Sequence, residues 1–221
     1  MTNLPARHSP VLPGSTAPGC CSRRGTFYSA LVQEFFDLRP ADGFQLIMAD
    51  PPWQFATRSA KGVTAKGAGG QYGLMTLADI MAMPVSVLAA DDAVLWLWAT
   101  NPMLRQGIDV LDAWGFTFKT AGHWAKRTKH GKLAFGTGFI LRCAGEPFLI
   151  GTRGAPRTSR SVRSVIEGPL REHSRKPDEA FAAAEQLMPD ARRLELFSRQ
   201  RRPGWTNWSN ESQKFGATND A

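Results

Sequence analysis

The chain has 221 residues, of which 43% are hydrophobic and 21% charged, so it can bury a core without a disulfide or metal staple. Lysine and arginine (27) outnumber aspartate and glutamate (19), which favours a polyanionic partner. The three cysteines form no CxxC pair, which excludes a zinc module and a secreted disulfide framework. With no long apolar run and no signal-peptide pattern, we expect a cytoplasmic protein without a membrane partner.

The N-terminal third of the chain predicts a tail, a helix, a strand and a loop. Residues 1–25 are rich in Pro, Gly and Ser, so they are predicted to be a flexible tail. An amphipathic helix is predicted over residues 30–38. The apolar run FQLIMAD, residues 44–50, predicts a buried strand, because the two prolines after it cannot donate to a strand ladder. The glycine-rich residues 54–75 are predicted to be a loop that gates the substrate.

Strands and helices then alternate to the end of the chain. A helix is predicted to begin at Thr76, capped with Asp79, and another to run from Asn101 as N-cap to Gly115 as its stop. The remaining predicted elements are strands over 93–100, 116–124, 139–143, 146–151 and 193–199, and a helix over 177–188. This alternation indicates one α/β domain over residues 26–212, with a mostly parallel sheet, helices on both faces, and a tail over 213–221.

The tetrapeptide DPPW follows the first predicted strand directly. Ligands of open α/β sheets bind beyond the carboxyl ends of the strands, so these residues are the expected site. Pro51 and Pro52 restrict the backbone, which presents the Asp50 carboxylate and the Pro51 carbonyl as rigid acceptors beside the Trp53 ring. This arrangement suits a flat heterocycle with an exocyclic amino group, which would stack on Trp53 and donate to both acceptors.

The same acceptors have a catalytic use. The lone pair of an adenine amino group is delocalised into the ring, and two oxygen acceptors favour its localised, nucleophilic form and stabilise the positive charge of alkylation. An aspartate carboxylate is too weak a base to deprotonate such an amine beforehand. Proton loss is therefore expected to follow methyl transfer.

The sequence resembles the bacterial and phage members of the MT-A70 family of N6-adenine methyltransferases, over about residues 44–211, which implies a bacterial or phage-encoded protein. The motifs that carry the resemblance are ADPPW, QYGLMTLADI, LWLWATNPML, HWAKR, GTGFILRCAGEPFLIGTRG, REHSRKPDE and ELFSRQRRPGWTNWSNE. The resemblance implies a Rossmann-like class I methyltransferase fold that uses S-adenosylmethionine, with the catalytic motif N-terminal to the cofactor-binding motifs. It implies catalytic roles for Asp50, Pro51, Pro52 and Trp53. The cofactor-binding residues that it implies are Asp50, Lys176, Phe197, Ser198, Arg199, Asn210 and Glu211.

Basic clusters near the presumed adenine pocket predict contacts with backbone phosphates. A target adenine must leave a duplex, or be single-stranded, before its amino group can reach Asp50. The predicted substrate-binding residues are Trp53, Tyr72, Asn101, Lys126, Arg153 and Arg157. The loop over 54–75 and the segment over 153–163 are the expected clamps.

The expected function is transfer of a methyl group to adenine N6 in nucleic acid, with DNA as the favoured substrate. Three alternatives stay open: the same reaction on RNA, a catalytically silent nucleic-acid-binding subunit, and N4 methylation of cytosine. A homodimer or heterodimer is also possible. The recognition sequence and the strand preference do not follow from these residues.

Overall fold

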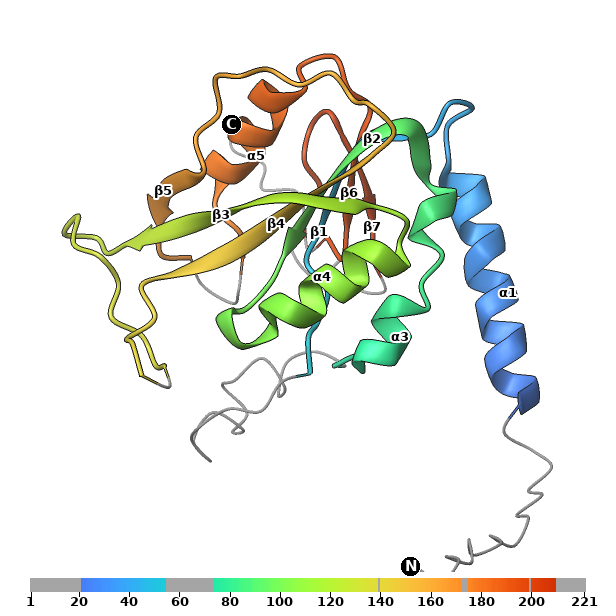
Figure 1. Cartoon of the computed structure of the whole chain (residues 1–221), viewed down its shortest axis with the longest axis horizontal. Coiled ribbons are helices and arrows are strands. Elements are labelled where there is room, and N and C mark those ends of the chain that lie inside the picture. The colour runs from blue at the N-terminus through green and yellow to red at the C-terminus, as the bar shows by residue number, and fades with distance from the viewer. Residues whose placement is uncertain (1–20, 55–73, 139, 172–174, 199, 210–221) are drawn as a thin grey trace, which may run out of the picture.

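The computed structural model of the chain describes residues 21–54, 74–138, 140–171, 175–198 and 200–209, with side chains from residue 28 onward. Within them lies a seven-stranded sheet in the order β5-β3-β4-β2-β1-β6-β7, with helices on both faces (Figure 1). The strands are β1 (Phe44–Ala49), β2 (Ala89–Trp98), β3 (Thr117–Arg127), β4 (Gly145–Arg153), β5 (Val165–Pro169), β6 (Arg193–Leu196) and β7 (Trp205–Trp208). The helices are α1 (Cys21–Leu38), α3 (Leu77–Met81), α4 (Leu104–Ala113) and α5 (Asp178–Leu187), with short 3-10 turns at Val85–Val87 and Asn101–Met103.

The sheet is mixed because one strand runs against the others. β1 pairs in parallel with β2 and β6, β6 with β7, and β3 with β5. β4 is antiparallel to both of its neighbours, β2 and β3. The prediction of a mostly parallel α/β sheet is thus confirmed. Since β4 is reversed, β1, β2 and β3 still point the same way, and their carboxyl ends share one edge, which we call the reactive edge.

Two apolar clusters pack on the two faces of the sheet. One joins α1, α3 and α4 to the sheet, and Phe35, Ile80 and Val110 are completely buried in it. The other joins α5 to the sheet through Phe181 and contains the tryptophans Trp96, Trp98 and Trp124. The two faces of β1 contribute residues to different clusters, since Ile47 lies in the first and Met48 in the second. This central, doubly covered position fixes where the residues after β1 emerge.

The backbone at Gly43, just before β1, lies very close to the backbone at the start of β2. Gly43 has φ +72°, and a Cβ atom there would lie 2.6 Å from the backbone nitrogen of Ala90. Gly131, in the loop after β3, has a similar φ of +74° but no atom within 4 Å of a Cβ. Only the first position therefore combines a left-handed backbone with a steric need for glycine.

Several predicted elements are confirmed. The side chain of Thr76 accepts a hydrogen bond from the Asp79 backbone N–H, as the predicted cap requires. The buried strand after residue 43, the helix over 177–188 and the stop at Gly115, with φ +80°, are also present. Within the described residues, no helix is long and apolar enough to cross a membrane.

Other predictions need correction. The N-terminal helix begins at Cys21, inside the segment predicted as tail, while residues 1–20 and 213–221 lie outside the described residues. Asn101 is not the N-cap of a continuous helix, because it opens a 3-10 turn that precedes α4. Residues 140–143 form no strand. β5 and β7 were not predicted, because they are only five and four residues long and lack an apolar run.

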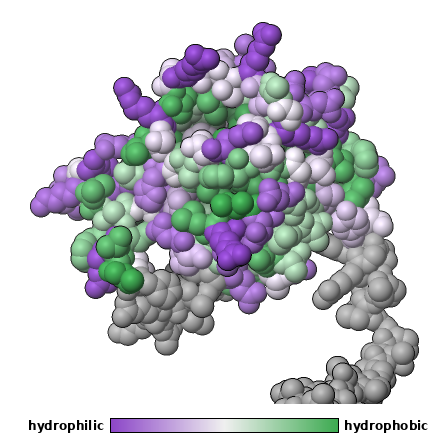
Figure 2. All heavy atoms as spheres, viewed as in Figure 1, coloured by the Kyte–Doolittle hydropathy of each residue, from purple (hydrophilic) through white to green (hydrophobic). Residues whose placement is uncertain are grey.

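The surface carries both polar and apolar residues, as the space-filling view shows (Figure 2). Apolar residues gather at the lower left of that view, over the loop between β3 and β4, next to strongly polar ones. Figure 1 shows that this loop projects away from the sheet.

Candidate active site

The DPPW turn leaves β1 at the reactive edge and is fixed by backbone hydrogen bonds. The Asp50 N–H donates to the Leu196 carbonyl of β6 at 3.4 Å, and the Trp53 N–H donates to the Pro51 carbonyl at 2.8 Å. The Met75 N–H donates to the Pro52 carbonyl at 3.0 Å, which ties the turn to the segment before α3. A carbonyl oxygen has two lone pairs, so Pro51 can still accept a hydrogen bond from a ligand.

Trp53 lies inside the protein rather than at its surface. Its side chain is 5% exposed, and its indole N–H donates to the Trp98 carbonyl at 3.0 Å. A ring this buried offers an incoming base little free surface, so the geometry gives Trp53 a supporting role: it anchors the turn that presents Asp50. The sequence-based expectation that a base stacks on this ring gains no support from the structure.

A chain of four alternating charges runs from Asp50 along the reactive edge. Lys176, which precedes α5, lies 2.9 Å from Asp50 Oδ2 and 2.7 Å from Glu146 Oε1. Lys126, at the end of β3, lies 3.0 Å from Glu146 Oε2. Each carboxylate in the chain therefore faces an ammonium group, which is the condition for burying such charges.

Burial and charge oppose each other at the two inner members of this chain. Lys176 is 7% exposed, and burial alone would lower the pKa of its ammonium, but Asp50 and Glu146 outweigh burial and raise that pKa. Burial alone would raise the pKa of Glu146, but Lys176 and Lys126 lower it. Both groups therefore stay charged at neutral pH.

A shallow pocket opens beside Asp50 and Lys176, and its non-atom space, open solvent included, is about 460 Å³. It combines cations, carboxylates and apolar surface, and its wall comes from three neighbouring strands and the start of α5. The lining residues are Met48, Asp50, Trp98, Arg175, Lys176, Phe181, Glu195, Phe197, Gln200 and Arg202.

Two features of the pocket wall are typical of functional sites. Phe197 has φ +63°, a left-handed conformation that is costly for a bulky residue and is concentrated at functional sites. The buried Nε of Arg202 and Nε1 of Trp98 have no hydrogen-bond partner among the described residues. Buried donors are normally satisfied, so these two N–H groups are an exception in the wall of the pocket.

Asp178, at the start of α5, holds the arginine side of the pocket in place. Its carboxylate accepts a hydrogen bond from Arg202 at 2.7 Å and forms a short contact with Arg171. Partial burial alone would raise the pKa of this carboxyl, but the arginines lower it. The Arg202 guanidinium also lies 3.8 Å from the centre of the Phe181 ring. The Arg202 side chain is thus positioned from two sides.

This arrangement (a DPPW carboxylate at a strand end, paired with a lysine beside a polar pocket) agrees with the comparison with known families. The sequence profile of the MT-A70 family matches residues 44–211. The chain belongs to the MT-A70 family. Methyltransferases of this family use S-adenosylmethionine.

Individual MT-A70 relatives differ in how much of them the chain covers. The type II methyltransferase M.MunI of Mycoplasma sp is 27% identical over 197 residues, which are 81% of this chain and 82% of the relative. An MT-A70-like N(6)-adenosine-methyltransferase of Arabidopsis thaliana is 32% identical over 173 residues, 76% of this chain and 24% of the relative. The human N(6)-adenine-specific methyltransferase METTL4 is 29% identical over 187 residues, 78% of this chain and 38% of the relative. The chain thus spans most of M.MunI but less than two fifths of the other two.

Several of the residues that the MT-A70 resemblance implied lie together at the reactive edge. Asp50, Lys176 and Phe197 line the pocket. Ser198 does not line it; its buried hydroxyl lies 2.9 Å from Glu195 and 2.9 Å from the amide of Asn207, so it supports the turn after β6. Tyr72, Arg199, Asn210 and Glu211 lie outside the described residues, and their predicted roles stay predictions.

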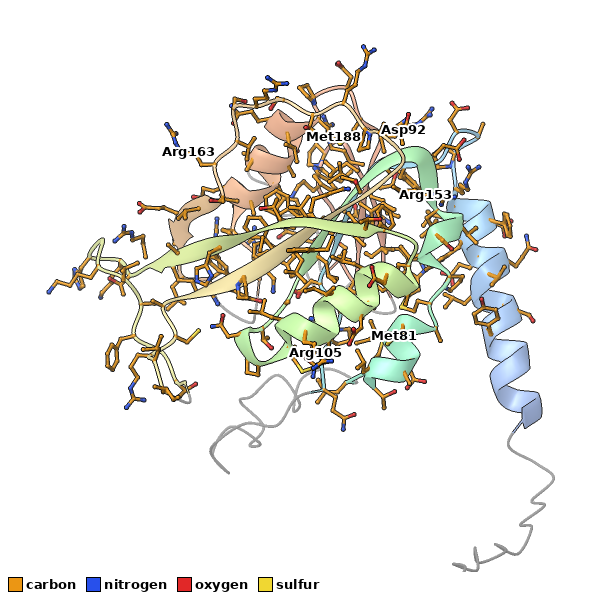
Figure 3. The ribbon with its side chains drawn as sticks, in the orientation of Figure 1. Met81, Asp92, Arg105, Arg153, Arg163 and Met188 are labelled. Atoms are coloured by element: carbon orange, nitrogen blue, oxygen red, sulfur yellow. The ribbon has the colours of Figure 1, made fainter. Side chains whose placement is uncertain are left out.

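The predicted substrate contacts divide between the two edges of the sheet. Asn101 follows β2 at the reactive edge, and Lys126 ends β3 there. Arg153 pairs with Ala93 near the beginning of β2, about five residues or roughly 16 Å of strand away from the level of Asp50. Figure 3 shows Arg153 with Asp92 and Met188 on the upper side, opposite Arg105 of α4.

Arg157 lies on the same remote edge as Arg153. It lines a separate hollow with Gln45 and Asp190, at the start of β1. Arg153 and Arg157 therefore do not lie beside Asp50, because β4 is reversed and carries the chain back across the sheet. Their predicted contacts with the substrate stay predictions.

Sequence reasoning missed Glu146 and Glu195, and it predicted Arg202 only as part of a basic cluster that contacts phosphates. Glu146 bridges two lysines, while the other two line the pocket. A signal for Glu146 exists, since it is an acidic residue directly before the apolar run of β4, but its role depends on the antiparallel pairing that opposes it to Trp124.

Proposed function

We propose that this chain is an enzyme that transfers a methyl group from S-adenosylmethionine to the N6 amino group of adenine in nucleic acid. The observation that carries the proposal is Asp50, held at the reactive edge by Lys176 and placed in the wall of a polar pocket. Membership of the MT-A70 family supports the reaction class.

DNA is the substrate we favour, and RNA is the second candidate. The chain spans 82% of M.MunI, a type II methyltransferase, and such enzymes act on DNA. The chain covers only part of the relatives whose names specify adenosine methylation, such as the Arabidopsis protein. Because that protein is 32% identical, RNA is also tested as a substrate. We place the reaction in the cytoplasm.

The residues of the pocket fit the polar groups of S-adenosylmethionine. Lys176, Arg175 and Arg202 supply cations for its carboxylate. Glu195 and Gln200 supply acceptors for hydroxyl groups. When bound, S-adenosylmethionine supplies an electrophilic methyl group on its sulfonium sulfur.

Asp50 acts on the target amine. Lys176 contacts its Oδ2 atom, so Oδ1 can accept a hydrogen bond from the adenine amino group. The Pro51 carbonyl offers the second acceptor, and together they favour the localised lone pair and stabilise the charge that develops on nitrogen. The carboxylate does not remove the proton first; the proton leaves the methylated nitrogen afterwards and passes to water.

The experiment measures transfer of tritiated methyl groups to methylation-free DNA and RNA by the wild type, by Asp50→Ala and by a control, Asp42→Ala. We expect Asp50→Ala to abolish methyl transfer. The variant should still fold, because Lys176 keeps its ion pair with Glu146. Asp42 is exposed and pairs only with Arg192 among the described residues, so its variant should keep full activity. Retention of more than a tenth of the wild-type rate by Asp50→Ala would contradict the proposal.

A further inference from the structure

The loop between β3 and β4 starts from the active site. This β3–β4 loop comprises residues 128–144, and the structure describes 128–138 and 140–144. Its two ends are joined by the Lys126–Glu146 ion pair of 3.0 Å, and Glu146 continues to Lys176 and Asp50. The loop therefore extends from the same edge of the sheet that presents Asp50, as Figure 1 shows for its place in the fold.

The described part of the loop exposes apolar side chains to an unusual degree. Leu133, Phe135, Ile140 and Leu141 are 51%, 80%, 95% and 82% exposed. A group of strongly exposed apolar residues rimmed by polar ones is typical of an interaction site. Figure 2 shows this apolar group with polar residues directly beside it.

The loop holds its shape through backbone hydrogen bonds. The Ala134 N–H donates to the Lys126 carbonyl, and the Gly136 N–H donates to the Cys143 carbonyl, both at 2.8 Å. The Thr128 N–H closes the tip by donating to the Lys132 carbonyl, also at 2.8 Å. These bonds fix the backbone at residues that flank the exposed apolar side chains.

The charge of the loop selects the kind of partner. Residues 128–144 contain Lys129, Lys132 and Arg142 and not a single Asp or Glu. Both lysines are exposed, and the Arg142 guanidinium lies 5.4 Å from the centre of the Phe135 ring, so cations and apolar groups are interleaved. A protein partner would have to bury these cations against acidic groups of its own, whereas a nucleic acid offers phosphates to the cations and bases to the apolar groups.

We propose that the β3–β4 loop is a nucleic-acid wedge: its basic residues bind the phosphates of duplex DNA, and its apolar residues enter the base stack beside the target adenine. The inference rests on the proposed function, which requires an adenine to leave the stack before it reaches Asp50. Apolar wedges of this kind replace lost stacking where a protein distorts a duplex. The wedge would be needed for a duplex and dispensable for a single strand.

The test compares methyl transfer to native and to heat-denatured methylation-free DNA. The variant is the triple substitution Phe135→Ser, Ile140→Ser and Leu141→Ser. Its control is Tyr28→Ser with Phe36→Ser, two residues of α1 that are 49% and 56% exposed. We expect the triple variant to lose about tenfold or more on native DNA and less than twofold on denatured DNA. The control should lose nothing on either.

A second measurement tests the loop independently of catalysis. Anisotropy of a labelled 30-base-pair duplex gives the dissociation constant over a range of salt, and Lys129→Gln with Lys132→Gln should lower the salt slope by about two. If the wild type methylates no nucleic acid, the proposed function is wrong. The binding measurement still tests whether the loop contacts duplex DNA, because it does not depend on catalysis.

Two results would overturn the wedge. The first is an unchanged ratio of native to denatured activity in the triple variant, with unchanged duplex affinity. The second is a wild type that is dimeric by light scattering and becomes monomeric in the triple variant, because the apolar group would then be an interface between protein chains.

Discussion

Replacing Glu146 by glutamine tests the charge chain that supports Asp50. The substitution keeps the size of the side chain but removes the charge that faces Lys176 at 2.7 Å and Lys126 at 3.0 Å. Removing one partner of a buried ion pair costs about 3–5 kcal/mol. Lys176 keeps its ion pair with Asp50, and the Lys126 side chain is 23% exposed, so its ammonium can be solvated. We therefore expect the free energy of unfolding to fall by less, about 2–3 kcal/mol.

The assay is thermal unfolding followed by circular dichroism. At about 2–4 °C per kcal/mol for a chain of this size, Glu146→Gln should lower the melting temperature by about 5–10 °C at pH 7. The matched control is Glu167→Gln, since Glu167 is an exposed glutamate that also pairs with a basic residue of β3, Arg127. The control should melt like the wild type, because exposed ion pairs contribute little.

The same experiment has a pH dependence with a fixed sign. Lys176 and Lys126 lower the pKa of Glu146 in the folded protein, although burial alone would raise it. A lowered folded pKa means that the stabilisation is present above the unfolded value, about 4.3, and is lost as the pH falls towards the folded value. The gap between wild type and Glu146→Gln should therefore narrow below about pH 4.3. Equal melting temperatures for Glu146→Gln and Glu167→Gln at pH 7 would refute this reasoning.

Three further predictions concern other parts of the molecule. Trp53→Phe removes the N–H donated to the Trp98 carbonyl and should destabilise the fold by about 1 kcal/mol in urea unfolding, with an unchanged KM for DNA; a change in KM alone would indicate base stacking instead. Gly43→Ala should lower the melting temperature clearly more than Gly131→Ala, since only Gly43 meets backbone atoms; equal effects would count against this. Arg157→Ala should leave the KM for DNA unchanged, and a rise of tenfold would restore Arg157 to the substrate site.

The direction of one strand explains which parts of the site were predictable. Asp50 follows from a local motif, because a strand that ends before two prolines needs no knowledge of neighbouring strands, whereas Lys176 was predicted only from the resemblance to the MT-A70 family. The position of Arg153 was not predictable, because a mostly parallel sheet does not say which strand is reversed, and a parallel strand over 146–151 would have ended at the reactive edge. β4 is antiparallel, so its first residues, with Glu146, lie at that edge and its last ones lie opposite.

Short edge strands and turn conformations lay beyond the sequence patterns. β5 and β7 take their form from pairing with β3 and β6, and their own residues alternate too weakly to predict a strand. The left-handed conformation of Phe197 is likewise imposed by its surroundings, since an aromatic residue does not favour it.

The identity of the methylated base is the most direct test of the central claim, that Asp50 and Pro51 present an adenine amino group for methylation. Methylation-free DNA is incubated with the wild-type protein and S-adenosylmethionine, digested to nucleosides and analysed by mass spectrometry. We predict N6-methyldeoxyadenosine as the product, and none with Asp50→Ala. N4-methyldeoxycytidine as the product, or equal yields from wild type and Asp50→Ala, would contradict the account.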